Sequence, residues 1–376
     1  MRICVNTRLL LPGKLEGIGR FTKETLKLLT ELHPEHEFIF IFDRKYSEEF
    51  IFNSNVKPVV AFPQARHPVL WYLFFEWGVP PVLRKYTPDV FLSPDGWLSL
   101  RTRVPSIPVI HDLNFYHNPG WVSPLPRYYY YRYFPKFIQK ATRIATVSEF
   151  SRQDISSRFK VPASQIDVVY NGIHDTHRPL GNEDISATRK RYADGAPYFL
   201  FLSLVHPRKN LTRIIGAYNR FRDTNQANIP LLIVGATKYM TEDTRSAHHN
   251  SPYRDQIKFL GRLPGEELRM ILGSGLALVY ASLFEGFGIP ILEAMQSCIP
   301  VITSDTTSMP EVGGNAVCYV DPYNEESIAE AMARIYHDEN YREHLVRAGV
   351  DQLNKFSWKK TAELLWDSVL RGVNPE

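Results

Sequence analysis

Short apolar runs recur along the whole chain and are separated by amphipathic stretches. Runs of this length predict strands buried on both faces, as in a parallel sheet that is covered by helices. In the first half they occupy residues 1–6, 37–42, 89–92, 107–111, 143–147 and 166–170. In the second half they occupy residues 198–204, 230–235, 256–260, 276–282 and 299–304.

Helical periodicity fills several of the intervals between these runs. Apolar residues with helical spacing follow a first loop that ends at Gly19, and further helical patterns fill 325–337 and 340–355. Alternating strands and helices in both halves predict two doubly wound α/β domains that face each other across a ligand-binding cleft. The polar stretch 173–195 is the best linker candidate, so we expect domains at 1–180 and 190–356.

Composition agrees with a globular two-domain protein. The chain has 376 residues, of which 44% are hydrophobic and 22% are charged. Its three cysteines have no metal-ligand spacing, and the N-terminus leads directly into a strand-like run without a signal peptide. No run of eighteen apolar residues occurs. These features predict a reduced, cytoplasmic protein.

Positive charge is concentrated in the first half. Residues 1–180 have 23 Lys and Arg against 16 Asp and Glu, a net charge of +7, whereas the remainder has a net charge of −3. This distribution suits an anionic acceptor or an anionic lipid surface, but it is too weak for a nucleic-acid-binding protein.

Two stretches, 67–86 and 127–143, are rich in aromatic residues, and the second has five basic residues and no acidic one. Such a composition fits peripheral contact with the inner face of a membrane. It equally fits helices that pack their aromatic rings on the sheet while Arg and Lys face water. Pro135 is predicted to interrupt any single long helix in the second stretch.

The stretch from Glu285 to Glu293 combines a glycine loop with two carboxylates. It follows a buried strand, and Pro290 is predicted to be the first residue of a helix. Gly286 and Gly288 allow backbone N–H groups to approach a ligand, and a helix N-terminus favours an anion. The carboxylates are better matched to hydroxyl groups, which a sugar and a ribose both have. An ordinary turn with two glutamates is the alternative.

Two cations follow the apolar run 198–204. Arg208 and Lys209 lie where a strand gives way to a helix, so both can face the same crevice and offset the charge of a departing diphosphate. A solvated basic turn is the alternative.

His111 directly follows a strand, which is where open α/β sheets bind ligands. The pattern Gly17-x-Gly19 lacks the third glycine of a dinucleotide fingerprint, which argues against nicotinamide binding.

Seven segments, in order, resemble the retaining GT-B glycosyltransferases of the Glu-x7-Glu type, in glycosyltransferase group 1 and family 4. The resemblance spans almost the whole chain. The segments are Gly17-Ile-Gly-Arg20, His111-Asp-Leu113, Val147-Ser-Glu-Phe-Ser151, Val169-Tyr-Asn-Gly172, Pro207-Arg-Lys-Asn210, Leu260-Gly-Arg262 and Glu285 to Glu293.

The resemblance implies a GT-B fold of two Rossmann-like domains, with the tail 357–376 crossing back to the first domain. It implies that Glu293 binds the ribose and that Glu285 holds the donor-sugar hydroxyls, with His111 opposite. Lys209 and Arg208 would stabilise the leaving diphosphate. The further donor-binding positions that it implies are Gly17, Gly19, Arg262 and the Gly286-Phe287-Gly288-Ile289 loop.

The sequence departs from the family's pattern at the end of the apolar run 198–204. The family's usual arginine is replaced there by Leu204 or a neighbour, so that Arg208 would substitute for it. The turn at Arg262 would hold the nucleobase mainly through backbone groups. Ser148, in contrast, is predicted to cap a helix rather than to react.

The sequence therefore predicts a retaining hexosyltransferase that acts on a glycan or lipid-linked acceptor in surface polysaccharide synthesis. The mannosyltransferase-like motifs favour GDP-mannose as the donor, with a UDP-sugar as the other option. No Asp-x-Asp occurs, so we expect neither a metal nor a cofactor in the reaction. A GT-B nucleotide-sugar epimerase and a non-catalytic nucleotide-sugar or membrane-surface binding protein are the rival hypotheses.

Overall fold

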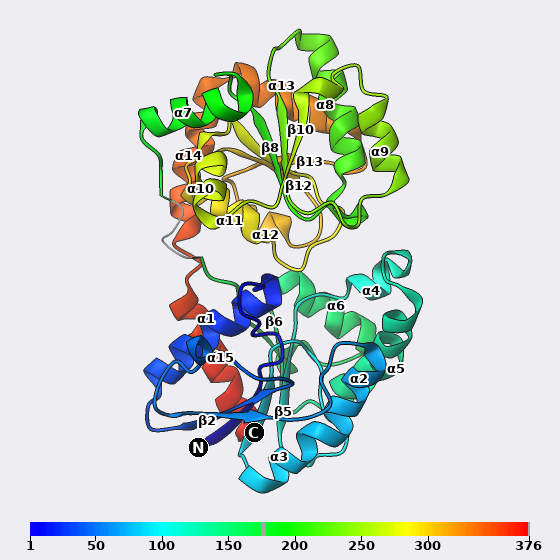
Figure 1. The fold of residues 1–376 in the computed structure, drawn as a ribbon, viewed down its shortest axis with the longest axis vertical. Coiled ribbons are helices and arrows are strands. Elements are labelled where there is room, and N and C mark those ends of the chain that lie inside the picture. The colour runs from blue at the N-terminus through cyan, green and yellow to red at the C-terminus, as the bar shows by residue number, and fades with distance from the viewer. Residues whose placement is uncertain (174–177, 375–376) are drawn as a thin grey trace. The chain divides into compact units, whose positions relative to one another are not determined.

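The computed structural model describes residues 1–173 and 178–374. The chain divides into two compact units (Figure 1). The first consists of Met1–Gly172 and the segment that begins at Ser357, and the second is Ile173–Phe356. Each unit is built on one parallel sheet, as the apolar runs predict.

The first unit contains a seven-stranded parallel sheet in the order β3-β2-β1-β4-β5-β6-β7. Cys4 on β1 pairs with Ile39 on one side and Phe91 on the other, which puts β1 inside the sheet. The strands are β1 (Arg2–Asn6), β2 (Glu37–Phe42), β3 (Val56–Val60), β4 (Val90–Ser93), β5 (Ser106–Ile110), β6 (Ile144–Thr146) and β7 (Ile166–Val168). The sequence did not predict β3, because Lys57 and Pro58 interrupt its apolar run. Such residues are tolerated at a sheet edge.

Helices cover both faces of this sheet. On one face α1 and α15 pack against each other, and α15 contacts β4 to β7. The other face is covered by α2, α3 and α5, whose aromatic residues join the core. The helices are α1 (Gly17–Leu32), α2 (Pro68–Leu73), a π-helical turn (Phe74–Gly78), α3 (Val79–Tyr86), α4 (Asn114–His117), α5 (Pro124–Lys140), α6 (Glu149–Phe159) and α15 (Trp358–Val373).

The predicted interruption at Pro135 is wrong, because α5 continues through it. A proline inside a helix costs about 3 kcal/mol. Here Phe134, Phe137 and Ile138 are buried in the core and offset that cost by packing. The aromatic stretch therefore covers the sheet, as one of the two hypotheses predicts, but it also has an outer side, because Tyr128 is 60% exposed.

The second unit contains a six-stranded parallel sheet in the order β10-β9-β8-β11-β12-β13. Its strands are β8 (Phe199–Leu202), β9 (Leu231–Val234), β10 (Ile257–Gly261), β11 (Ala277–Tyr280), β12 (Val301–Ser304) and β13 (Cys318–Val320). The edge strand β13 was not predicted, because three residues are too few to show a strand period.

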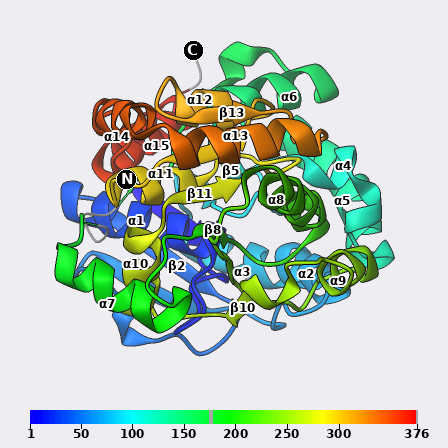
Figure 2. The same cartoon turned by 90° about the horizontal axis from the view of Figure 1, so that it is seen from above.

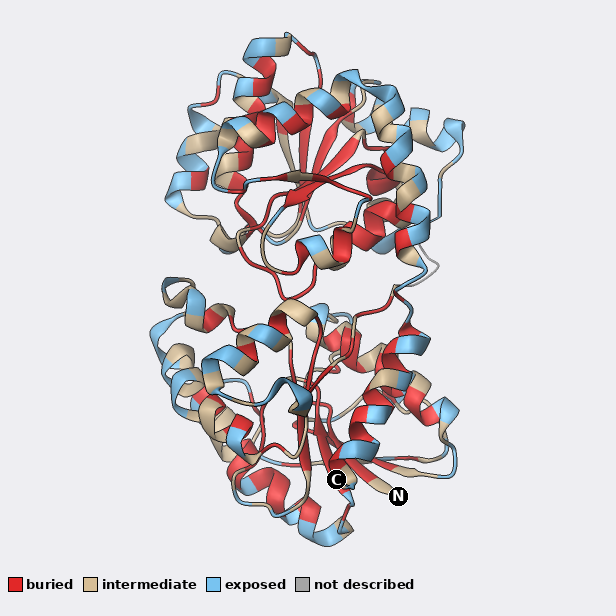
Figure 3. Ribbon diagram, turned by 180° about the vertical axis from the view of Figure 1, so that it is seen from behind, coloured by how far each residue is buried: buried red, intermediate tan, exposed pale blue. Residues whose placement is uncertain are grey.

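Helices α8 and α13 pack together over one face of the second sheet, and α10 and α11 lie toward the other (Figure 2). Figure 3 shows that the strands of both sheets are buried, whereas most helices bury one side only. The helices are α7 (Asn182–Ala193), α8 (Leu211–Asn225), α9 (Glu242–His249), α10 (Gly265–Ser274), α11 (Ile289–Gln296), α12 (Met309–Gly313), α13 (Glu325–His337) and α14 (Glu339–Leu353).

The predicted linker at 173–195 is partly wrong. Residues 182–193 form α7, which packs on α10 and belongs to the second unit. Arg189 donates a hydrogen bond to the Ser274 carbonyl at 2.9 Å, and Tyr192 is hydrogen-bonded to Glu267. The polar composition of α7 indicated a linker because the helix has one narrow buried side. The division between the units falls at Gly172.

Candidate active site

Arg208, Lys209 and Glu285 meet at the carboxyl edge of the second sheet. The cations lie in a 3₁₀ turn (Pro207–Lys209) after β8, and Glu285 lies in the loop after β11, the neighbouring strand. Glu285 accepts from Arg208 Nη1 at 2.6 Å and from Lys209 Nζ at 2.5 Å. The side chain of Arg208 is 24% exposed and that of Lys209 is 11% exposed. Both cations thus share one acid, and Arg208 is the more accessible to a ligand.

The loop around Glu285 is fixed by hydrogen bonds to neighbouring loops. Ser308, just before α12, donates to the carbonyls of Glu285 at 3.0 Å and Phe287 at 2.8 Å. The Leu283 N–H donates to the Arg208 carbonyl at 2.8 Å. These bonds connect the loops after β8, β11 and β12, so the three charged groups are positioned before any ligand binds.

Charge pairing determines the ionisation of Glu285. Burial alone raises the pKa of this carboxyl, but the nearby charges of Arg208 and Lys209 outweigh burial and lower it to about 2. Glu285 is therefore a carboxylate at any pH at which the protein would work. It is suited to accept hydrogen bonds from hydroxyl groups of a ligand, not to donate a proton.

Tyr280 belongs to the same candidate site and was missed by sequence reasoning. It is the last residue of β11 and is fully buried, and its hydroxyl accepts a hydrogen bond from Lys209 Nζ at 2.8 Å. Burial, and then the charge of Glu285, raise the pKa of Tyr280, so its hydroxyl stays protonated. The sequence feature that could have indicated it is a tyrosine at the carboxyl end of an otherwise aliphatic strand. We interpreted this tyrosine as part of the buried strand.

The glycine loop leads into α11 as predicted. Gly288 has φ +114°, a conformation that L-residues rarely adopt, and α11 begins at the next residue. The side chain of Phe287 is buried against Phe356, with ring centroids 5.6 Å apart, so we expect Phe287 to offer a ligand its backbone N–H and not its ring. Glu293 lies in α11, and its side chain is buried. Arg262 is exposed in the turn after β10.

In the first unit, His111 directly follows β5, as predicted. The His111 and Phe21 rings form a T-shaped pair with centroids 5.1 Å apart, and His111 Nε2 lies 2.8 Å from the Pro94 carbonyl oxygen. A carbonyl can only accept, so Nε2 holds the proton and Nδ1 is the unprotonated nitrogen. Burial lowers the pKa of His111, and the bond to Pro94 only partly opposes this, so the ring is neutral at pH 7.

A buried polar cluster near β1 and β4 was also missed. Arg8 forms a salt bridge with Asp95, and Asn6 donates hydrogen bonds to Asp95 at 2.8 Å and to Ser93 at 3.0 Å. These residues lie at the carboxyl ends of two adjacent strands of the first sheet. Their position after apolar runs was the available signal. The pairing between residues 87 positions apart could not be read from sequence.

The predicted loop through Gly17 and Gly19 is wrong in one respect, because α1 already begins at Gly17. A Cβ atom added at Gly19 would lie 3.0 Å from the Leu9 carbonyl oxygen, so close packing explains this glycine.

Ser148 caps α6 as predicted and accepts from the Ser151 N–H at 3.1 Å.

Comparisons with known proteins match both halves of the chain. The model for glycosyl transferases group 1 matches residues 184–352, and that for Glycosyltransferase Family 4 matches residues 15–177. The chain is 26% identical over 357 residues to the O-antigen chain mannosyltransferase B of Escherichia coli. That alignment covers 92% of this chain and 93% of the relative.

Two solved structures share the fold over nearly all of both chains. A glycosyltransferase from Rickettsia africae has a TM-score of 0.75 and 16% identity, with 100% of this chain and 99% of the other covered. Anabaena HepE, solved in complex with UDP and glucose, has a TM-score of 0.72 and 16% identity, with 98% and 99% covered. At this level of identity the likeness is one of fold.

Proposed function

The chain belongs to the GT-B glycosyltransferases, with a family 4 domain followed by a group 1 domain, and we propose that it is a retaining mannosyltransferase of surface polysaccharide synthesis. It would transfer a hexose from a nucleoside diphosphate sugar to a hydroxyl group of a glycan or lipid-linked acceptor. Support for mannose and for a surface polysaccharide comes from the E. coli relative, which is named an O-antigen chain mannosyltransferase. The HepE complex with UDP and glucose keeps a UDP-sugar open as the donor.

The observation that supports this function best is the pairing of Arg208 and Lys209 on Glu285. When the glycosidic bond to the diphosphate breaks, negative charge grows on the departing phosphate. Two fixed cations lower the energy of that state without a metal ion. The N–H groups of Gly286–Ile289 at the start of α11 would add donors for the same charge.

The carboxylates bind the uncharged parts of the donor in this proposal. Glu285, ionised and held by two cations, accepts from the hydroxyls of the transferred sugar. Glu293 accepts from the ribose hydroxyls. His111, whose Nδ1 is unprotonated, is the proposed sugar contact from the first unit. Transfer with retention has the acceptor attack from the face that the diphosphate leaves.

A thermal-shift screen followed by a transfer assay tests the donor assignment. GDP-mannose and GDP should raise the midpoint of unfolding more than UDP-, ADP- or dTDP-sugars, because only a ligand that prefers the native state stabilises it. Mass spectrometry should then find one added hexose on a mannose-containing acceptor. Stabilisation by UDP compounds alone would contradict the guanine assignment. An epimerised donor without transfer would contradict the reaction.

Replacing Glu293 by alanine should weaken nucleotide binding more than it lowers turnover. The ribose hydroxyls would lose a charged acceptor, and a hydrogen bond to a charged group is worth about 1.5–3 kcal/mol, or roughly 10- to 150-fold in Kd. Calorimetry with the nucleoside diphosphate measures the change. Glu311→Ala, at the start of α12, is the control. Equal affinity in the wild type and Glu293→Ala would remove the ribose role.

Replacing Tyr280 by phenylalanine should lower kcat about tenfold while KM changes little. The substitution keeps the ring but removes the hydroxyl that accepts from Lys209 at 2.8 Å, so the ammonium is held less firmly. A hydrogen bond to a charged group is worth about 1.5–3 kcal/mol, and a loss of about 1.4 kcal/mol in the transition state gives a factor of ten. Tyr218→Phe, which also removes a buried hydroxyl in the same unit, is the matched control for folding. A kcat equal to that of wild type would show that Tyr280 only packs.

The outer side of α5 supports peripheral binding to a membrane surface. Leu125, Tyr128 and Arg132 are exposed at helical spacing that puts them on one side of α5. Aromatic and basic residues on one side of a helix favour the interface of an anionic bilayer. None of the helices in the described part of the chain is long and apolar enough to cross a membrane.

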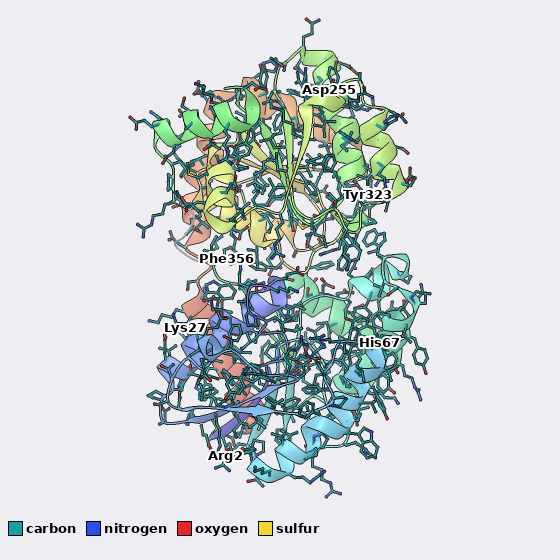
Figure 4. All side chains as sticks on the ribbon, viewed as in Figure 1. Arg2, Lys27, His67, Asp255, Tyr323 and Phe356 are labelled. Carbon is teal, nitrogen blue, oxygen red and sulfur yellow. The ribbon has the colours of Figure 1, made fainter. Side chains whose placement is uncertain are left out.

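The double variant Tyr128→Ser, Arg132→Glu should lose about tenfold or more in affinity for vesicles containing anionic lipid. A basic residue near such a surface contributes about 1 kcal/mol, and charge reversal removes that attraction and adds repulsion. Flotation with neutral and anionic vesicles measures binding. Tyr323→Ser is the control, because Tyr323 is 62% exposed in the second unit (Figure 4). Wild-type flotation that does not depend on lipid charge would remove the membrane proposal.

A further inference from the structure

The turn between α1 and β2 gathers two imidazoles and a carboxylate. His33 directly follows α1, and Glu35 and His36 precede β2. Glu35 Oε1 lies 3.3 Å from His36 Nε2 and 3.9 Å from His33 Nδ1. The three ligand atoms all lie within 4.8 Å of one another. This turn belongs to the first unit, whereas Arg208, Lys209 and Glu285 belong to the second.

Trp366 of α15 fixes the two imidazole rings. Its ring stacks on His33 with a centroid distance of 3.9 Å and an interplanar angle of 19°, and on His36 at 5.0 Å and 25°. The His33 and His36 side chains are 21% and 17% exposed, but Glu35 is 61% exposed. Stacking therefore limits the movement of the rings, while the exposed carboxylate can adjust and water can reach the cluster.

These distances fit a tetrahedral transition-metal ion. Zinc binds nitrogen and oxygen ligands at about 2.0–2.2 Å, which puts neighbouring donor atoms roughly 3.4 Å apart. The Glu35–His36 pair at 3.3 Å already has this separation, and the Glu35–His33 pair at 3.9 Å needs a small movement of the exposed Glu35. The two imidazole nitrogens lie within 4.8 Å of each other and would have to approach by at most about 1.4 Å. Two imidazoles favour zinc, nickel or copper, whereas magnesium and calcium prefer sites made of oxygen.

We propose that His33, Glu35 and His36 bind one divalent transition-metal ion of the zinc class, with water as the remaining ligand. The ion would join the end of α1 to the start of β2. The Met1 amine lies 3.1 Å from His36 Nδ1. In the metal-bound form that nitrogen must hold the ring proton, so the amine either accepts from it in the neutral form or moves away.

Equilibrium dialysis of the chelator-treated full chain against ZnCl₂ tests the proposal. The wild type should bind one zinc per chain at this site. The double variant His33→Asn, His36→Asn should bind it at least tenfold more weakly, and Glu35→Gln should show a smaller loss. His67→Asn is the control, because His67 is an exposed histidine at the start of α2, where asparagine can also cap (Figure 4). Equal zinc affinity in the double variant, or no binding by the wild type, would overturn the proposal.

Tryptophan emission gives a readout that does not depend on sugar transfer. All six tryptophans lie outside residues 173–356, and Trp366 is the one stacked on both histidines. Ni²⁺ should quench part of the emission of the wild type and much less in Trp366→Phe and in the double histidine variant. Equal quenching in all three proteins would place the ion elsewhere and overturn the proposal. None of these outcomes depends on the assignment of Arg208, Lys209 and Glu285.

Discussion

Lys209→Ala is expected to lower turnover about a hundredfold. In the structure, Lys209 Nζ is held between the Glu285 carboxylate at 2.5 Å and the Tyr280 hydroxyl at 2.8 Å. In the proposed reaction it faces the diphosphate as charge develops there. Removing one such preorganised donor typically costs two to three orders of magnitude in kcat, and Arg208 remains to supply part of the stabilisation. KM should change less than kcat, because the interaction strengthens in the transition state.

Initial rates of mannose transfer at saturating donor measure this loss. Lys258→Ala is a matched control, because Lys258 is a lysine of β10 in the same unit whose ammonium pairs with Asp194 at 3.2 Å. Its turnover should stay within twofold of wild type. If Lys209→Ala also kept the wild-type rate, Lys209 would have no part in stabilising the leaving group.

Glu285→Gln is expected to lower both turnover and the stability of the second unit. The amide can bond to one cation, but Arg208 and Lys209 would then lie side by side without a counter-charge. Removing one partner of a buried ion pair costs about 3–5 kcal/mol. For a unit of this size, that corresponds to a midpoint of unfolding lower by roughly 6–20 °C. Turnover should fall about a hundredfold or more, because the cations and the sugar hydroxyls lose the same acceptor.

The stability difference between the wild type and Glu285→Gln should depend on pH in a way that follows from the pKa of Glu285. The pKa of Glu285 is lowered to about 2 in the folded protein. The ionised side chain therefore contributes fully to stability above the unfolded-state pKa of about 4.3. The contribution is lost as pH falls from there through about 2. The difference in midpoint between wild type and Glu285→Gln should therefore be constant from pH 5 to pH 8 and narrow only below about pH 4.

Differential scanning calorimetry at several pH values is the appropriate measurement, since two units need not unfold together. Tryptophan emission helps to assign the transitions, because no tryptophan lies in 173–356. Glu266→Gln is the control: Glu266 is exposed and pairs with Arg269 within one turn of α10, so the midpoint of unfolding should hardly change. A stability difference that varied between pH 5 and pH 8 would contradict the assigned ionisation.

Much of the fold can be predicted from the order of apolar and polar residues within short stretches of the sequence. The apolar runs predicted eleven strands because a strand buried on both faces needs side chains of one kind along its whole length. The two edge strands escaped prediction, since β3 includes Lys57 and Pro58 and β13 has three residues. The course of α5 through Pro135 depended on burial of Phe134, Phe137 and Ile138, a tertiary effect that local propensity does not contain.

Candidate site residues could be named from the sequence mainly where a reactive residue type follows a strand end. Arg208, Lys209 and Glu285 were each identified from position and residue type, and their mutual contacts follow from β8 and β11 being neighbours in the sheet. Tyr280 was hidden because a tyrosine in a buried strand looks like core. The Arg8–Asp95 pair was hidden because it joins strand ends far apart in sequence.

A crystal structure of the protein with GDP bound tests the central claim most directly. We expect diphosphate oxygens within hydrogen-bond distance of Arg208, Lys209 and the N–H groups that begin α11, with the ribose hydroxyls on the Glu293 carboxylate. A diphosphate bound elsewhere, with the Arg208 and Lys209 side chains still paired with Glu285, would contradict this assignment.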